Sequence, residues 1–136
     1  MSAVVTAARR RIEREHEDVL EAVDACADAV AASWNREATS DRTAVVDPFQ
    51  TVLEKRGVAS RLPRVLADAV DATGHALSAS PVPAPPYVVV TSRGPVLRAT
   101  IGPGRLVIRL DVFEVVRGEP TRYRRRDGTD LVVSLE

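Results

Sequence analysis

Residues 81–116 have the sequence PVPAPPYVVVTSRGPVLRATIGPGRLVIRLDVFEVV, and the change of pattern inside this stretch decides the fold class. Its first six residues include four prolines, which lack amide donors and force extended neighbours. A helix therefore cannot run through residues 81–86. Beyond them, apolar and polar residues alternate with the period of a half-buried strand. The proline segment is thus a connector between a helical part, residues 1–80, and a β part, residues 87–136.

The β part contains five runs with strand periodicity. They are residues 87–91, 96–101, 105–116, 121–126 and 131–135, with turn signals at 93–95, 102–104, 117–120 and 127–128. Short links between neighbouring strands predict antiparallel pairing. In the third run the apolar residues change face near Val112, which predicts a β-bulge at that point.

The first helix is expected to span residues 3–35. Apolar residues recur there at steps of three and four, or their sums, at Val5, Ala8, Ile12, Val19, Val23, Val30 and Trp34. His16 and Cys26 fall within this stripe and should face a partner surface. Because the stripe is nearly a heptad repeat, it could pair with a second copy of the chain, as a homodimer, as readily as with another helix.

Two further helices are expected before the prolines. Residues 35–46 are polar and aperiodic, which predicts a loop. Asp47 as the N-cap and Pro48 in the first turn then predict a helix over residues 48–56. Ser60 can cap a third helix that runs to about residue 78.

Together these patterns predict an α+β fold in a single domain over residues 1–136. Three N-terminal helices would pack on one face of a four- to five-stranded antiparallel sheet, because neither part can bury its apolar face alone. A chain of 136 residues has the usual size of one domain. Its apolar content of 45% and charged content of 28% are ordinary for a soluble globular protein.

Composition also excludes several classes of protein. Nineteen acidic residues balance nineteen basic ones, so the strong overall field of a histone-like protein is absent. The single cysteine cannot form an internal disulfide, which fits a reducing compartment. The apolar runs are too short to span a membrane, and residues 1–15 lack the apolar region of a signal peptide. A cytoplasmic protein without membrane contact is expected.

The sequence indicates no metal, no cofactor and no catalytic residue. Glu13 and His16 have the E-x-x-H spacing of carboxylate-bridged metal bundles, but those need four helices and a second such pair. Cys26 lies about 15 Å along the same helix from His16, so these two side chains cannot act together. A base for Cys26 could come from His75, and an enzyme with a pocket between helices and sheet is the third functional hypothesis.

Arginines on the strands carry the leading hypothesis. Alternation places Arg98, Arg105 and Arg109 on the sheet face opposite the apolar residues. With Tyr123, they would form a surface through which a non-enzymatic binding or adaptor protein meets an acidic protein partner. The alternative is RNA binding through Arg122, Tyr123, Arg124 and Arg126, where guanidinium groups would grip phosphates and the tyrosine would stack on a base.

Residues 85–100, PPYVVVTSRGPVLRAT, and the near absence of lysine resemble small uncharacterised haloarchaeal proteins. The resemblance covers the central and C-terminal half of the chain and implies no activity. Cytoplasmic proteins adapted to salt are expected to be strongly acidic, whereas this chain has no net charge. Either the origin differs, or the basic groups are kept for a partner.

Overall fold

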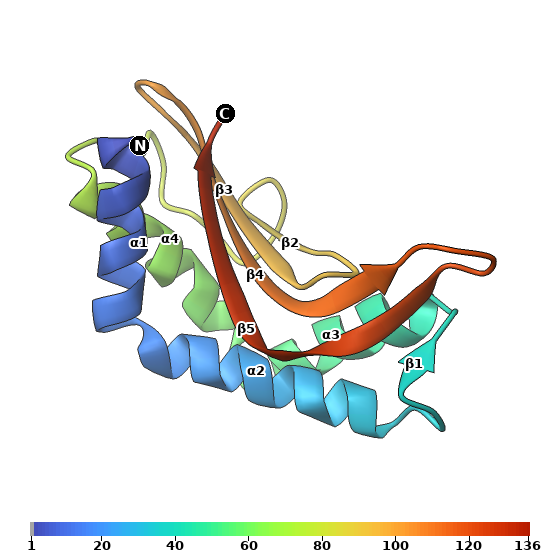
Figure 1. The fold of residues 1–136 in the computed structure, drawn as a ribbon. Helices are drawn as coiled ribbons and strands as arrows, with labels where there is room; N and C mark the ends of the chain where they lie inside the picture. The colour runs from blue at the N-terminus through green and yellow to red at the C-terminus, as the bar shows by residue number, and fades with distance from the viewer. Residues whose placement is uncertain (1) are drawn as a thin grey trace.

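Four α-helices and a five-stranded antiparallel sheet form an α+β fold in the computed structural model, which describes residues 2–136 (Figure 1). The helices are α1 (Ala3–Glu15), α2 (Glu17–Ala32), α3 (Thr43–Lys55) and α4 (Leu62–Ala72), and a short 3-10 helix, η1 (Ala59–Arg61), precedes α4. The strands are β1 (Ala38–Thr39), β2 (Val88–Val90), β3 (Pro95–Ile101), β4 (Gly104–Val116) and β5 (Arg122–Leu135). None of the helices within residues 2–136 has both the length and the apolar content needed to cross a bilayer.

The strands lie in the order β1-β5-β4-β3-β2, and β4 and β5 bend sharply halfway along their length (Figure 1). The helices follow the outer side of this bend: α1 and α4 lie beside one arm, while α2 lies beneath the other. Contacts join α2 to β4 and β5, α4 to β3, and α3 to β2. One apolar cluster therefore joins the helices to the sheet, with fully buried side chains that include Ile12, Phe49, Leu66, Leu97, Ile108 and Phe113.

The prediction of one long helix over residues 3–35 is wrong, because the chain breaks at His16. This residue leaves helical geometry at φ −129° and ψ 24°, ending α1 and starting α2. Its N–H donates to the carbonyl of Ile12, and its own carbonyl accepts from Val19 and Leu20. The break lets α1 pack against α4 while α2 runs beneath β4 and β5. The apolar stripe continues across the break, because α1 and α2 both turn their apolar residues toward the same core. These residues therefore pack against other segments of the same chain.

The predicted loop over residues 35–46 and helix over 48–56 are both partly wrong. β1 pairs with β5, and α3 begins at Thr43, whose N–H donates to Oδ1 of Asp41 at 2.9 Å. Pro48 lies inside α3, where it cannot donate to the carbonyl of Ala44, four residues earlier. The indole Nε1 of Trp34 donates to that carbonyl at 3.0 Å instead. A distant side chain thus makes the interior proline tolerable.

The third predicted helix is too long. It ends at Ala72, and Gly74 follows with a φ of +82°, a left-handed conformation that closes helices. Ser60 does not cap it, because this residue lies in η1 and its hydroxyl donates to the carbonyl of Gly57 at 3.0 Å. Leu77, which falls within the predicted range of the helix, lies beyond its observed end but still packs against the core.

The sheet confirms the antiparallel pairing and the β-bulge. The pairing of β4 with β5 shifts between Asp111 and Phe113, where the bulge was expected. The predicted turn at residues 127–128 is wrong, since 122–135 form one strand. Asp111 pairs with Asp130, and Phe113 pairs with Arg125. Between these two pairs, β4 has one residue, Val112, whereas β5 has residues 126–129. Gly128 therefore lies in an irregular part of β5 and not in a hairpin turn.

Candidate functional site

The side chains of the sheet that point away from the helices form a surface that we call the open face. Side chains alternate along a strand. Leu97 of β3 and Leu106 and Ile108 of β4 are buried in the core, so their neighbours along each strand point to the opposite side of the sheet. The open face comprises Val96, Arg98 and Thr100 of β3, Arg105, Val107, Arg109 and Asp111 of β4, and Val132 and Ser134 of β5. The structure thus places the three predicted arginines Arg98, Arg105 and Arg109 together on this face.

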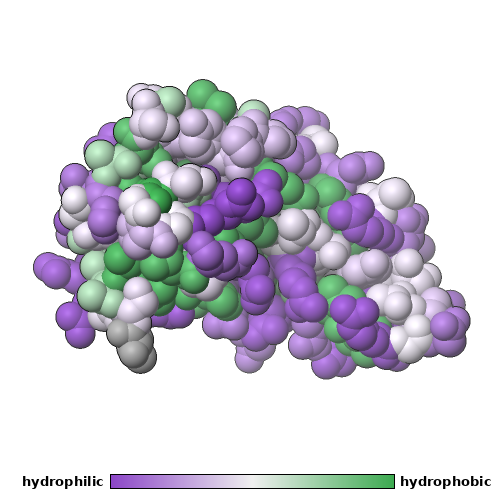
Figure 2. Space-filling model, turned by 90° about the horizontal axis from the view of Figure 1, so that it is seen from above, coloured by the Kyte–Doolittle hydropathy of each residue, from purple (hydrophilic) through white to green (hydrophobic). Residues whose placement is uncertain are grey.

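Valines lie between the arginines of the open face. Val96, Arg109 and Val132 form one row across the sheet, and Arg98, Val107 and Ser134 form the next. Val107 is only 8% exposed, although no helix covers it, because long arginine side chains can shield apolar neighbours with their stems. Seen from above, hydrophobic side chains surface in patches between hydrophilic ones and become fewer toward the β4–β5 hairpin (Figure 2).

The three arginines of the open face differ in their partners. Nη2 of Arg109 lies 3.0 Å from Oδ2 of Asp111, a carboxylate that is 5% exposed. This ion pair neutralises Arg109. Within residues 2–136, Arg98 and Arg105 make no ion pair, so their positive charges remain available to a partner.

Arg98 and Arg105 flank a small pocket at the β2 edge of the sheet. The pocket has a volume of about 330 Å³ and is lined by Tyr87, Thr100 and the segment 77–79 in addition to the two arginines. Nε of Arg98 donates to the carbonyl of Pro86 at 3.3 Å, which holds this side chain against the proline segment. Tyr87 and Thr100 were not predicted as site residues, because the pattern along one strand does not show which residues of neighbouring segments flank the arginines.

The second predicted cluster, Arg122 to Arg126, is divided between the two sides of the sheet. Tyr123 pairs with Val115 and packs against the core, and Arg125 also points toward the helices. Arg124 forms an ion pair with Glu114, and Nη2 of Arg126 lies 3.8 Å from Oδ2 of Asp130. Of the three predicted arginines in this cluster, only Arg122 makes no ion pair within residues 2–136. The tyrosine therefore does not lie beside the arginines that were expected to accompany it.

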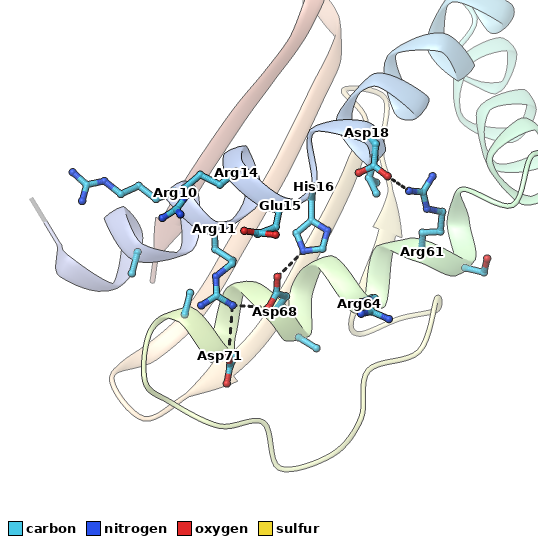
Figure 3. A pocket seen from close by; sticks show the side chains of 15 residues that line it. Arg10, Arg11, Arg14, Glu15, His16, Asp18, Arg61, Arg64, Asp68 and Asp71 are labelled. Carbon is cyan, nitrogen blue, oxygen red and sulfur yellow. Dashed lines mark hydrogen bonds and ion pairs between the residues drawn. The ribbon is translucent and has the colours of Figure 1, made fainter.

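A further group of charged residues joins α1 to α4. His16 and Arg11 both point at Asp68 of α4 (Figure 3). Nε2 of His16 lies 2.8 Å from Oδ2, and Nη1 of Arg11 lies 2.6 Å from Oδ1. The prediction that His16 faces a partner surface is confirmed, because this surface is α4. No sequence signal links these residues, because they are brought together by helix packing.

The groove beside these residues has a volume of about 1180 Å³. Its central cations are already paired, since Arg11 bonds to Asp68 and Arg61 bonds to Asp18. Arg10 extends away from α4 (Figure 3). Within residues 2–136, no cluster of three or more histidine, cysteine or acidic side chains is placed to hold a metal ion. The groove is therefore a mixed surface in which carboxylates offset much of the positive charge.

Asp68 makes this contact dependent on pH. Its partial burial would raise the pKa of the carboxyl, but hydrogen bonds from His16 and Arg11, with the charge of Arg11, hold that pKa below its ordinary value of 3.8. A depressed folded-state pKa stabilises the protein fully above the unfolded-state pKa. This stabilisation is lost as the pH falls through the folded-state pKa.

We expect Asp68→Asn to lower the free energy of unfolding by about 1–2 kcal/mol at pH 7, because two partly buried donors lose a charged acceptor. The difference from the unmodified protein should shrink at pH 3, below the ordinary pKa of 3.8, because the unfolded chain takes up a proton at Asp68 before the folded protein does. Urea unfolding at both pH values measures this. An equal difference at pH 7 and pH 3 would contradict the assignment. Asp71→Asn, at an exposed position where Oδ2 lies 3.5 Å from Arg11, is the control with a smaller effect.

The structure does not bring Cys26 and His75 together. Cys26 is fully buried on α2, and burial raises the pKa of its thiol. His75 is exposed in the segment that follows α4. The hypothesis of an enzyme that uses this pair has no geometric support.

Comparison with known proteins identifies one family. The model of a domain of unknown function (DUF7988) matches residues 6–136. No curated protein and no solved structure matches the chain.

Proposed function

We propose that this chain, which belongs to the DUF7988 family of domains of unknown function, is a non-enzymatic binding protein that docks an acidic protein partner on its open face. One observation carries the proposal. Arg98 and Arg105, which make no ion pair within residues 2–136, lie beside valines on a side of the sheet that the helices leave uncovered.

The composition of the open face suits an interface. Protein interfaces combine an apolar centre with a polar rim, and arginine is enriched among the residues that dominate their binding energy. Here Val96, Val107 and Val132 provide apolar area, and the stems of Arg98 and Arg105 extend it. A partner that covers the valines would desolvate the two guanidinium groups and strengthen their bonds to carboxylates.

Charge complementarity favours an acidic partner. Asp111 lies at the bend and pairs with Arg109, and Asp130 lies opposite it on β5 and pairs with Arg126. Glu136 lies beside Arg105, because the backbones of these two residues exchange hydrogen bonds of 2.8 Å. Arg98 has Val107 as its neighbour on β4 and no carboxylate opposite it, so the excess of positive charge is around Arg98. Such an excess speeds association with acidic surfaces and disfavours basic ones.

The nucleic-acid alternative has less support. Arg124 and Arg126 are paired with carboxylates, and Tyr123 does not lie on the open face to stack on a base. Retention on RNA that falls steeply with salt would favour it.

The homodimer, the haloarchaeal origin and the cytoplasmic location stay predictions.

A photo-crosslinking amino acid at the exposed Thr100 identifies the docked protein in its native cell, and purified proteins then give its affinity. We expect Arg98→Glu combined with Arg105→Glu to weaken binding at least about tenfold, because two favourable charge contacts become repulsive. Arg10→Glu combined with Arg14→Glu is the matched control, at exposed arginines of α1 that make no ion pair within residues 2–136. The control should bind normally. Equal effects of the two double variants, or a captured partner with a basic contact surface, would contradict the proposal.

A further inference from the structure

We infer that the pocket between Arg98 and Arg105 binds a phosphate monoester as its dianion. This inference goes beyond the docking of a protein, because it concerns a small group that the pocket can hold whether or not a partner covers the open face. It rests on the strand register, the fixed position of Arg98 and the absence of acidic residues from the lining of the pocket in residues 2–136.

The register makes Arg98 and Arg105 neighbours at one pocket. Thr100 pairs with Arg105 and Arg98 pairs with Val107, so Arg98 and Arg105 are diagonal neighbours on adjacent strands. Such neighbours are separated by about 7–8 Å, which long side chains can bridge. Both side chains therefore reach an anion that lies above Thr100.

Arg98 is held in place for this role. Its Nε donates to the carbonyl of Pro86, and its two terminal nitrogens make no hydrogen bond within residues 2–136. Those terminal nitrogens form the fork that grips two oxygens of one anion. Because the side chain is already fixed at Nε, less conformational entropy is lost when a ligand binds.

Neutral donors complete the pocket. Thr100 brings a hydroxyl group. Tyr87 lines the pocket beside Arg98, whose N–H donates to the tyrosine carbonyl at 2.8 Å, and the side chain of Tyr87 packs in part against the core. Since this N–H points to the outer edge of β3, alternation turns the N–H of Thr100 to the same edge. β2 pairs with β3 only from Pro95 to Leu97, so no strand covers the edge at Thr100.

The charge and number of donors favour a phosphate monoester over a carboxylate. A phosphate monoester carries nearly two negative charges at pH 7 and three strong acceptor oxygens, which match two guanidinium groups and the neutral donors. A carboxylate brings one charge and two oxygens. The volume of about 330 Å³ is at the small end of ligand pockets, so the organic part is short. A free phosphorylated metabolite and a phosphorylated side chain share this chemistry.

Calorimetry and amide NMR with glycerol 3-phosphate test the inference on the full chain. We expect saturable binding, with the largest shift at the Thr100 amide, and weaker binding of acetate. Arg98→Gln and Arg105→Gln should each reduce the affinity about tenfold or more, because each removes a charge-assisted hydrogen bond. Arg64→Gln, at an exposed arginine of α4 outside the pocket, should bind normally.

Equal losses in Arg64→Gln, or acetate binding as tightly as the ester, would overturn the inference. A phosphoserine tripeptide distinguishes the two sources: tighter binding than glycerol 3-phosphate identifies a phosphorylated protein, and weaker binding identifies a free metabolite. Thermal unfolding of each variant verifies that it is folded. Because no partner protein is present, this experiment can succeed when the docking experiment fails, and the reverse also holds.

Discussion

Replacing Gly94 with alanine is expected to destabilise the protein by more than about 4 kcal/mol, which is exceptional for one methyl group. Gly94 lies between β2 and β3 with a φ of +144°, a conformation that other residues rarely adopt. A Cβ atom there would lie 2.0 Å from the carbonyl oxygen of Leu110. The obstacle is backbone in the centre of the sheet, so it cannot rotate away as a side chain could.

The same turn also supports the β-bulge. The carbonyl of Arg93, next to Gly94, accepts hydrogen bonds from the N–H groups of Val112 at 2.8 Å and Phe113 at 3.0 Å. Moving the turn to make room for a methyl group would therefore disturb the bulge as well. Both the steric cost and the loss of these hydrogen bonds contribute to the expected effect.

Gly57→Ala is the matched control. Gly57 also has a positive φ, of +72°, but nothing lies within 4 Å of the position of its missing Cβ. The conformational cost alone, about 1–2 kcal/mol, should appear there. Urea unfolding followed by the fluorescence of Trp34 compares the two variants. Similar losses in Gly94→Ala and Gly57→Ala would show that the close approach to Leu110 does not exist.

Arg125→Met is expected to cost about 3–5 kcal/mol, because it removes a largely buried guanidinium group that is bonded to two carboxylates and to backbone carbonyls. The side chain of Arg125 is 14% exposed and bonds to Asp24 and, at 3.1 Å, to Asp28, both on α2. Its Nη1 also donates to three carbonyls around the irregular part of β5, those of Val112, Arg126 and Gly128. Without the guanidinium group, these acceptors and the Asp24 carboxylate lose their partner.

Arg124→Met separates this effect from a general loss of positive charge. Arg124 is the neighbouring residue, and its ion pair with Glu114 is on the surface, with 57% of the arginine side chain exposed. Such pairs contribute about 0–1 kcal/mol. Urea unfolding measures both variants, and equal costs would contradict the role assigned to Arg125. If Arg125→Met does not fold, Arg125→Lys should fold with an intermediate loss, because it keeps the charge without the five donors.

Local patterns predicted β2, β3 and β4 well, but they missed β1 and divided β5 into two strands. β2, β3 and β4 differ from the expected segments by at most a few residues, and the bulge lies where the apolar residues of β4 change face. These features depend on which side of a strand each residue occupies, and alternation along the chain determines that side. The same rule predicted that Arg98, Arg105 and Arg109 share one face, and the strand register places them there.

Contacts between distant segments could not be predicted in this way. The apolar stripe of residues 3–35 did not reveal the break at His16. Its steps of three and four continue across the break, because both helices turn their apolar residues toward the same core. The interior position of Pro48 depends on the indole of Trp34. The pairing of Arg109, Arg124 and Arg126 with carboxylates and the pocket beside Tyr87 likewise depend on register and packing.

By itself, the sequence determined the α+β class, the antiparallel sheet, the bulge in its third predicted strand and the face that carries the three arginines. The reason is that backbone periodicity and proline restrict each segment locally, whatever surrounds it. Only the tertiary structure decided which arginines keep an unpaired charge and that Arg98 and Arg105 share a pocket. Those properties are set by distances between side chains far apart in the chain, and such distances exist only after the helices and strands have packed.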